Sequence, residues 1–293
     1  TNLSGDHLDY HEDMEGYLRA KRRLFEALGP EGWAIVNRDD AAAGRLLERC
    51  RSRVLGFGLE GGAEVGARIR RMELAGSSFE LISAGGRVAV RTALMGRHNV
   101  LNALAAAATG VAWGIDLETI RRGLEKVDRV PGRLERVGPE GGPITVLVDY
   151  AHSDDALRNV LEALRPIKRG RLIVVFGCGG ERDRSKRPRM GRVACELGDV
   201  VIVTSDNPRG ERPQAIIDEI LAGIEGWGME RVEVEPERRK AIWRAVELAD
   251  EGDVVVIAGK GHERYQVVAG RRLPFDDVAV AAGAVRRRLG SGA

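Results

Sequence analysis

Cysteine is scarce in this sequence of 293 residues, and Cys50, Cys178 and Cys195 show no C-x-x-C spacing. This argues against a zinc site and against a disulfide framework. Long hydrophobic runs are also missing, because no apolar stretch approaches the roughly 20 residues that a membrane-spanning helix needs. No signal peptide opens the sequence. We therefore expect a protein of the reducing cytoplasm without a membrane segment.

An excess of one charge is absent as well, since 46 basic residues face 44 acidic ones for a net charge of +2. Proteins that bind nucleic acid usually carry a clustered basic face, so we expect no nucleic-acid partner. Apolar residues make up 43% of the sequence, which suits a well-buried core, and this length usually holds about two domains. The first residue is Thr rather than Met, so we expect a fragment or a processed product.

From about residue 144 onward, apolar runs rich in Val and Ile alternate with stretches of helical spacing. The runs are 144–148, 171–176, 200–204, 231–234 and 253–258, and the helical stretches are 154–165, 187–197, 212–224 and 236–249. Short buried strands between amphipathic helices indicate βαβ units and a parallel sheet. A hairpin of Tyr265–Val268 against Arg271–Leu273 and a helix at about 277–288 follow. We predict a doubly wound, Rossmann-like α/β domain.

The first half is less regular. The predicted elements are a helix at 13–28, a strand at Trp33–Asn37, and helices at 98–112 and 116–126. Residues 53–92 alternate apolar and polar positions around Gly-Gly and Gly-Ser turns, which predicts an antiparallel meander. The segment 129–142 holds two Pro and four Gly and is the predicted hinge.

Polar corners follow four of the predicted strands. They are VDYAH (148–152), FGCGGERDR (176–184), TSDNPR (204–209) and AGKGHE (258–263). In an open parallel sheet, loops converge and ligands bind at the carboxyl ends of the strands. The corners therefore predict one active site, suited to an anionic ligand and to a ligand that carries carboxylates.

Two of these corners allow a simpler interpretation. Neither FGCGG nor AGKGH fits a dinucleotide-binding or Walker A pattern. The charged run Glu181–Arg187 is either a solvated turn or a clamp in which Arg182 or its neighbours bind a carboxylate through guanidinium forks. Asp206-Asn207-Pro208-Arg209 is either a plain turn or a zwitterion site, with the acid for an ammonium and Arg209 for a carboxylate. Gly259 and Glu263 would lie close enough to contribute.

Two further segments of the first half are candidates. His98 and Asn102 share one face of the Ala-rich helix, either as part of a capped helix start at His98-Asn99 or with Asn102 as an amide that binds a ligand. The segment DHLDYH (6–11) gathers two acids and two histidines shortly before Lys21. It is either a capped helix start or part of a site for a divalent metal ion.

Together these segments resemble the Mur ligases, the cytoplasmic ATP-dependent amino-acid ligases of peptidoglycan synthesis. The resemblance rests on TNLSGDHLDYHEDMEGYLRAK, GRHNVLNALAA, VPGRLE, VDYAHSDDAL, VFGCGGERDRSKRPRMG, TSDNPRGE and AGKGHERYQ. It implies part of a central ATPase-type α/β domain at 1–133 and a C-terminal amino-acid-binding domain at 134–293. The family's P-loop and its uridine-nucleotide domain belong upstream of residue 1, so we expect no turnover by this chain alone.

The resemblance also implies a reaction and a set of residues. ATP and Mg²⁺ would convert the D-Glu carboxylate of UDP-MurNAc-L-Ala-D-Glu into an acyl phosphate, which the amine of the incoming amino acid attacks. By similarity, Mg²⁺ would be held by His7 and by Lys21 as a carbamate, and ATP by Asn102, Arg133, Asp149 and His152. The amino-acid pocket would comprise Arg182, Asp206, Asn207, Pro208, Arg209, Gly259 and Glu263.

The DNPR corner favours meso-diaminopimelate as the amino acid. The distal end of this molecule is itself a zwitterion, whereas L-Lys lacks the distal carboxylate and would leave Arg209 unmatched. Sites built for a hydrogen-bonded group reject analogues without it by roughly 10⁴-fold. The partners we expect are small molecules and the protein a monomer. The alternatives are a sister ligase, such as folylpolyglutamate synthase or the tripeptide-to-pentapeptide ligase, and a non-catalytic amino-acid-binding module.

Overall fold

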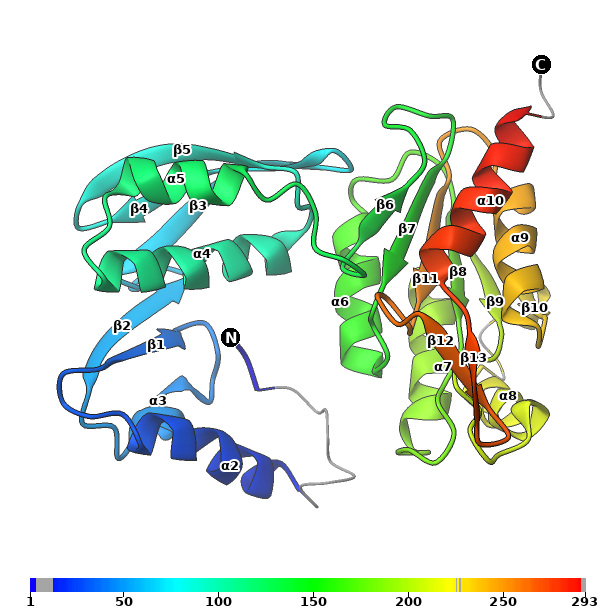
Figure 1. Cartoon of the computed structure of the whole chain (residues 1–293), viewed down its shortest axis with the longest axis horizontal. Helices are drawn as coiled ribbons and strands as arrows, with labels where there is room; N and C mark the ends of the chain where they lie inside the picture. Colours follow the sequence, from blue (N-terminus) through cyan, green and yellow to red (C-terminus); the bar gives the residue numbers. More distant parts are fainter. Residues whose placement is uncertain (4–12, 225, 227, 291–293) are drawn as a thin grey trace. The chain divides into compact units, whose positions relative to one another are not determined.

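The computed structural model of the chain describes residues 1–3, 13–224, 226 and 228–290. The chain forms two compact units, a first unit of Thr1–Asp128 and a second unit of Arg129–Ala293. Both contain helices and strands (Figure 1), which confirms the predicted α/β class. The domain boundary predicted after Arg133 stays a prediction. Within the described residues, no helix combines the length and the apolar character that crossing a membrane requires.

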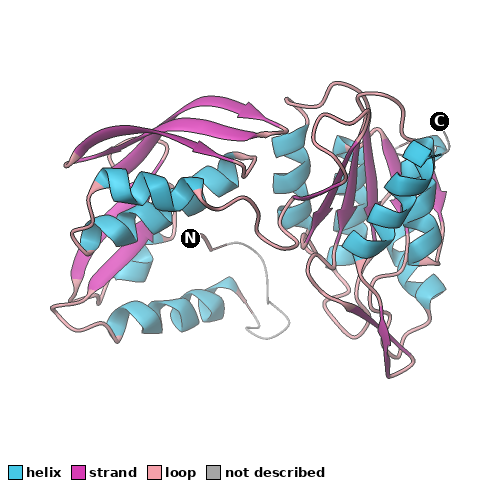
Figure 2. Ribbon diagram, turned by 45° about the horizontal axis from the view of Figure 1, so that its top comes forward, coloured by secondary structure: helices cyan, strands magenta, loops and turns pink. Residues whose placement is uncertain are grey.

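The first unit is built on one sheet (Figure 2). Its elements are α2 (Met14–Glu26), β1 (Trp33–Asn37), α3 (Ala43–Leu47), β2 (Arg53–Gly58), β3 (Val65–Glu73), β4 (Gly76–Ser83), β5 (Gly86–Thr92), α4 (Arg97–Ala112) and α5 (Leu117–Glu125). The strands follow one another in chain order across the sheet. Strands β3, β4 and β5 pair antiparallel, as predicted for 53–92.

The predicted meander is wrong for β2, which pairs parallel with both β1 and β3. The carboxylate of Asp39, just after β1, accepts hydrogen bonds from the backbone N–H groups of Leu59 (2.7 Å) and Glu60 (3.1 Å). These bonds hold the chain after β2 beside the end of β1, which agrees with the parallel pairing of the two strands. The local alternation of residues cannot reveal such a distant partner.

Helix α4 covers this sheet with small side chains. Leu104, Ala107 and Ala108 are fully buried and belong to one core cluster with Phe57 and Val65 of the sheet. Apolar side chains at these spacings form one face of a helix. The Ala-rich stretch therefore serves close packing, as its composition suggests.

The second unit contains the predicted parallel sheet and its helices. Its elements are β6 (Glu135–Val137), β7 (Thr145–Asp149), α6 (Asp154–Leu164), β8 (Leu172–Phe176), α7 (Lys186–Leu197), β9 (Val200–Val203), α8 (Pro213–Leu221), the 3₁₀ helix η1 (Met229–Arg231), β10 (Val232–Val234), α9 (Arg238–Leu248), β11 (Val254–Ala258), β12 (Tyr265–Val268), β13 (Arg271–Pro274) and α10 (Asp277–Gly290). The strand order is β10-β9-β8-β11-β7-β6, and all neighbours are parallel except β6 and β7.

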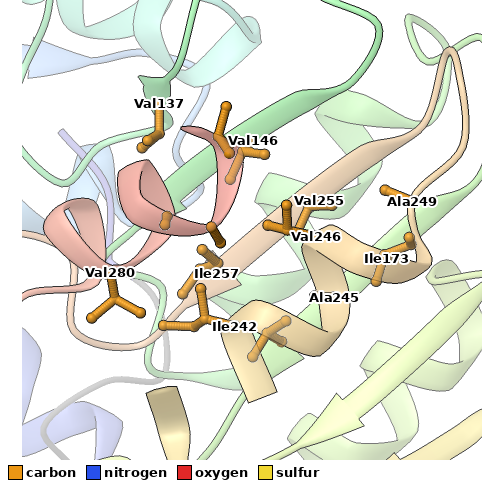
Figure 3. Packing of buried hydrophobic residues seen from close by; sticks show 14 of the residues in the cluster. Val137, Val146, Ile173, Ile242, Ala245, Val246, Ala249, Val255, Ile257 and Val280 are labelled. Atoms are coloured by element: carbon orange, nitrogen blue, oxygen red, sulfur yellow. The ribbon is translucent and has the colours of Figure 1, made fainter. Parts of the chain in front are cut away.

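Both faces of the sheet are buried, as its Val and Ile content predicts. Figure 3 shows Val146, Val255 and Ile257 of the strands beside Ile242 and Val246 of α9, all members of one core cluster. Residues that alternate with them along β7 and β11 are buried as well. A sheet of this kind needs helices on both sides. The doubly wound fold is thereby confirmed.

The predicted hinge at 129–142 is only partly a connection. It contains β6, whose three residues pair antiparallel with β7, and Val137 joins the core of the second unit. The glycines that suggested a hinge include Gly132, where a Cβ atom would lie 2.3 Å from the backbone nitrogen of His262. Glycine is thus required here for a close approach of two backbone segments.

Candidate functional site

Four strand ends of the second unit meet at one edge. Strands β9, β8, β11 and β7 are adjacent in this order and parallel, so the corners that follow them lie next to one another. The corner after β7 leads into α6, where Ser153 caps the helix by accepting a hydrogen bond from the Ala156 N–H. The structure therefore brings the four predicted corners together.

The side-chain amide of Asn207 lies at the centre of these corners. Its Nδ2 donates to Oε2 of Glu263 at 2.9 Å, and its Oδ1 accepts from Lys260 Nζ at 3.0 Å. The backbone N–H of Val267 donates to the same Oδ1 at 3.0 Å. Lys260 Nζ also lies 3.1 Å from Oε2 of Glu263. The corner after β9 is thereby bonded to the corner after β11, although β8 separates the two strands.

Two arginines flank Gly179 in the corner after β8. A Cβ atom built there would lie 2.9 Å from Nη1 of Arg209 and 3.8 Å from Cγ of Arg182. Arg209 Nη1 donates to the carbonyl of Gly180 at 2.6 Å. Arg209 has a φ of +53°, a left-handed conformation that is uncommon for a residue other than glycine. Its backbone is fixed there by bonds to Val267 and Ala269.

Asp206, Pro208 and Gly259 complete the predicted pocket. Gly259 has a φ of +117°, and a Cβ atom on it would lie 2.5 Å from Oδ2 of Asp206. Gly180 likewise leaves no room for a side chain, because the Pro208 carbonyl oxygen lies 2.0 Å from the position of its Cβ. Asp206, Asn207 and Pro208 are all buried. The seven residues predicted for the pocket thus lie around one set of corners.

A buried arginine connects two of the segments that surround these corners. Arg187 is fully buried and donates to both carboxylate oxygens of Glu211 at 2.8 and 3.0 Å and to Glu219 at 2.9 Å. It also donates to the Gly179 carbonyl at 3.2 Å. Glu211 in turn accepts from the Glu181 N–H at 2.6 Å. Arg187 therefore ties the corner after β8 to the loop that leads into α8.

We expect the Glu211 interaction to make the fold sensitive to acid. The hydrogen bonds from Arg187, followed by that from the Glu181 N–H, lower the pKa of Glu211 to about 2 from 4.5. A carboxylate with a lowered pKa contributes stability above its unfolded-state value, and the contribution is lost as the pH falls from 4.5 towards 2. With allowance for partial exposure, we expect a loss of roughly 2 kcal/mol. Urea unfolding of wild type and Glu211→Gln should show a stability gap at pH 7 that closes over this range. A gap that is independent of pH would contradict the assignment.

The corner after β7 contains Asp149 and His152, two of the four residues predicted for ATP. Oxygens of the Asp149 carboxylate accept from the backbone N–H groups of Leu134 at 2.7 Å and Ala151 at 2.8 Å. Burial raises the pKa of Asp149, and these two hydrogen bonds act against the increase. Leu134 has a φ of +46°, so the carboxylate anchors a strained turn. Asp149 thus fixes the position of Arg133, whose guanidinium lies 5.1 Å from the centre of the Tyr150 ring.

Two histidines pack against the Tyr150 ring. The centres of His152 and His262 are 4.8 and 5.2 Å from that of Tyr150. His152 Nδ1 lies 2.9 Å from the Tyr150 carbonyl oxygen. Because a carbonyl only accepts, this nitrogen carries the proton. The corner therefore presents aromatic and cationic groups together.

The remaining predicted residues belong to the first unit. Asn102 is exposed on α4, and its Nδ2 lies 3.3 Å from Oδ1 of Asn99. The helix begins after Gly96 without a side-chain cap, so the capping interpretation of His98-Asn99 is wrong. Lys21 is exposed on α2, with its Nζ 5.2 Å from the centre of the Tyr17 ring. His7 lies outside the described residues. Among the described residues, no group of three or more His, Cys, Asp or Glu could hold a metal ion.

Sequence reasoning did not predict the structural roles of four residues of the site. Lys260, Arg187 and Arg238 are fully buried charges that tie the corners together, and Tyr150 is the ring shared by Arg133 and the histidines. Lys260 and Tyr150 lie inside the AGKGHE and VDYAH segments, so their position in the sequence was the available signal. Nothing in the sequence marks Arg187 or Arg238 as buried.

We expect the cysteine near the site to be inert. Cys178 lies in the corner after β8, and its burial raises the pKa of the thiol to about 12. Burial also raises the pKa of Cys195, whereas Cys50 is partly exposed. Alkylation requires an accessible thiolate. Iodoacetamide at pH 8 should therefore label only Cys50 in the native protein, which peptide mass spectrometry can show. Labelling of native Cys178 at the rate of Cys50 would contradict this.

The two units match two domains of one family. Residues 1–110 match the Mur ligase middle domain, and residues 132–261 match the glutamate ligase domain of Mur ligases. The chain belongs to the Mur ligase family. This confirms the resemblance found in the sequence.

The similar proteins include ligases for diaminopimelate. The chain is 48% identical over 292 residues to the UDP-N-acetylmuramoyl-L-alanyl-D-glutamate–2,6-diaminopimelate ligase of Gloeobacter violaceus, covering 100% of this chain and 59% of the relative. It is 47% identical over 283 residues to the ligase of the same name from Solibacter usitatus, covering 96% and 57%. The chain thus spans less than two thirds of the length of these relatives.

Solved structures show the same fold. A 2,6-diaminopimelate ligase structure is 38% identical with a TM-score of 0.63, covering 98% of this chain and 59% of that one. The folylpolyglutamate synthase of Mycobacterium tuberculosis, complexed with ADP and AMPPCP, is 26% identical with a TM-score of 0.72, covering 99% and 62%.

Proposed function

We propose that the protein carrying this chain is an ADP-forming cytoplasmic ligase that joins meso-diaminopimelate to UDP-MurNAc-L-Ala-D-Glu through an acyl phosphate. The observation that carries the proposal is the pairing of opposite charges at one set of corners. Arg182 and Arg209 flank Gly179 on one side, and the Glu263 carboxylate is bonded to Asn207 on the other. The names of the similar ligases support the choice of amino acid.

The corners suit the distal end of meso-diaminopimelate. Arginine forks bind a carboxylate, and the carboxylates of Glu263 and Asp206 can receive an ammonium. Holding this end fixes the amino acid so that its other amine can reach the acyl phosphate. The amine nitrogen then attacks the carbonyl carbon, the new C–N bond forms, and phosphate leaves as its bond to that carbon breaks. L-Lys offers the distal ammonium without the carboxylate.

The proposed nucleotide and metal residues follow the family. Mur ligases generally use ATP and Mg²⁺. By similarity to the family, we assign Arg133, His152 and Asn102 to ATP contacts. For Arg133 the structure adds a reason, because an exposed arginine beside an aromatic ring suits a phosphate group. Asp149 is engaged by two backbone N–H groups and would act by fixing Arg133. Lys21, as a carbamate, and His7 are the proposed Mg²⁺ ligands, and the ion would neutralise phosphoryl charge.

The test is amino-acid choice by the purified full-length protein that carries this chain. With UDP-MurNAc-L-Ala-D-Glu, ATP and Mg²⁺, we expect phosphate release with meso-diaminopimelate, and a kcat/KM for L-Lys that is lower by roughly 10⁴-fold. Equal use of L-Lys would contradict the assigned amino acid. Binding of diaminopimelate without any phosphate release would instead favour the non-catalytic module.

A further inference from the structure

Lys260 is a charged residue of the pocket for which the proposed function gives no role. Its side chain is fully buried, and its ammonium contacts Asn207 Oδ1 and Glu263 Oε2. Lysine is almost never fully buried unless it is paired, because desolvating the charge is costly. We propose that Lys260 is a positioning residue that fixes the orientation of the Asn207 amide and so makes this corner select a carboxylate. This inference rests on the proposed function.

The orientation of the Asn207 amide follows from its partners. The Lys260 ammonium and the Val267 backbone N–H can only donate, and both lie 3.0 Å from the same side-chain atom. That atom must therefore be Oδ1, and Nδ2 must lie on the other side, where Glu263 accepts from it. Two groups that can only donate thus fix which atom of the amide is the oxygen.

The fixed amide presents a donor to a ligand. Asn207 Nδ2 has two N–H groups, of which Glu263 takes one, while Oδ1 already accepts two hydrogen bonds. Asn207 can therefore add an N–H to those of Arg209, two residues further along the chain. Both groups donate hydrogen bonds, so they suit an acceptor such as a carboxylate.

Lys260 also controls the charge beside this donor. Glu263 Oε2 lies 3.1 Å from the Lys260 ammonium, so part of its negative charge is compensated. Without Lys260, the amide would keep only one fixed donor at Oδ1, and the Glu263 charge would oppose an incoming carboxylate. Binding of a ligand that carries a distal carboxylate should therefore weaken, whereas binding of L-Lys should not.

The experiment compares three variants of the protein in the ligase assay. Lys260→Met removes both hydrogen bonds while keeping an unbranched apolar chain. Asn207→Asp keeps an acceptor for Lys260 and Val267 but replaces the donating Nδ2 by oxygen. Lys168→Met is the matched control, because Lys168 also bonds a carbonyl and a carboxylate, Gly170 O and Asp199 Oδ2, each at 2.8 Å. It lies at the opposite, amino end of the sheet, where β8 begins.

We expect Lys260→Met to raise the KM for meso-diaminopimelate by about 10- to 100-fold, the range for losing hydrogen bonds of a charged group. The use of L-Lys and the KM for ATP should stay within about threefold of wild type, and Lys168→Met should match wild type. The Asn207→Asp variant should lose its preference for meso-diaminopimelate over L-Lys at least as strongly as Lys260→Met does. An equal loss for both amino acids in Lys260→Met, or the same change in Lys168→Met, would overturn the inference.

A second measurement is independent of turnover. In ¹⁵N NMR spectra of the chain, exchange of the Asn207 side-chain amide protons with water should be at least about tenfold faster in Lys260→Met than in wild type. Unchanged exchange would overturn the role of Lys260. If wild type does not use diaminopimelate, the proposed function fails, and this measurement alone decides whether Lys260 orients Asn207.

Discussion

Replacing Asp277 by Ala should lower the free energy of unfolding by about 3 to 5 kcal/mol, the usual cost of removing one partner from a buried ion pair. Asp277 and Arg238 both have fully buried side chains. The Arg238 Nε and Nη2 donate to the two carboxylate oxygens at 2.8 and 2.7 Å. Without the carboxylate, the guanidinium would remain in the core as an uncompensated charge.

The same pair supports the site. Arg238 Nη2 donates to the Ala258 carbonyl at 2.9 Å, and Nη1 lies 3.4 Å from the Ser205 carbonyl. These two residues immediately precede Gly259 and Asp206 of the pocket. We therefore expect Asp277→Ala to weaken amino-acid binding as well as stability.

Urea unfolding of three variants measures this effect. Asp250→Ala is the control, because Asp250 pairs with Arg171 in the same unit but is 80% exposed, and such pairs contribute about 1 kcal/mol or less. The double variant Arg238→Met, Asp277→Leu should regain much of the stability lost by Asp277→Ala, since no unpaired charge remains. A cost of Asp277→Ala no larger than that of Asp250→Ala would contradict the importance of the buried pair.

Replacing Arg209 by Met should reduce kcat/KM for meso-diaminopimelate by about 10²- to 10³-fold, since a bound carboxylate would lose its guanidinium partner. Arg209 is fixed by its bond to the Gly180 carbonyl and by its left-handed backbone. Its donors are therefore preorganised, and their loss should affect binding more than the loss of a flexible surface charge. The reaction with L-Lys, which lacks the distal carboxylate, should change much less.

Arg184→Met is the matched control for this variant. Arg184 lies in the neighbouring corner after β8, is 66% exposed and pairs with Glu219. Steady-state kinetics with both amino acids should show near wild-type behaviour for Arg184→Met. Equal losses in the two arginine variants, or an equal loss for L-Lys in Arg209→Met, would place the carboxylate-binding group elsewhere.

The fold of the second unit could be predicted because its signals are local. Continuous Val and Ile runs mark strands buried on both faces, and Leu157, Val160, Leu161 and Leu164 mark the buried face of α6. Strand β6 was missed because its three residues lie between glycines and owe their conformation to pairing with β7. In the first unit, β2 pairs parallel with β1 and the Leu59 N–H donates to Asp39, 20 residues earlier in the sequence, which a local pattern does not reveal.

The site was predictable where residue type and strand ends coincide. Asp206, Asn207 and Arg209 follow a strand directly, and the rule for parallel sheets places them at a common edge. Buried charges were not predictable, because the sequence of a charged run such as Arg182–Arg187 does not show which of its residues the fold buries. Only Arg187 of that run is fully buried. The ligand contacts assigned to these residues stay predictions.

A crystal structure of the protein with meso-diaminopimelate tests the central claim most directly. We expect the distal carboxylate between Arg182, Arg209 and the Nδ2 of Asn207, with the distal ammonium at Glu263. Pro208 of the predicted pocket also lines a cavity of about 330 Å³, together with residues that include Pro213, Pro236 and Phe275. Density for the ligand in that cavity, or a bound ligand whose carboxylate touches neither arginine, would contradict the claim.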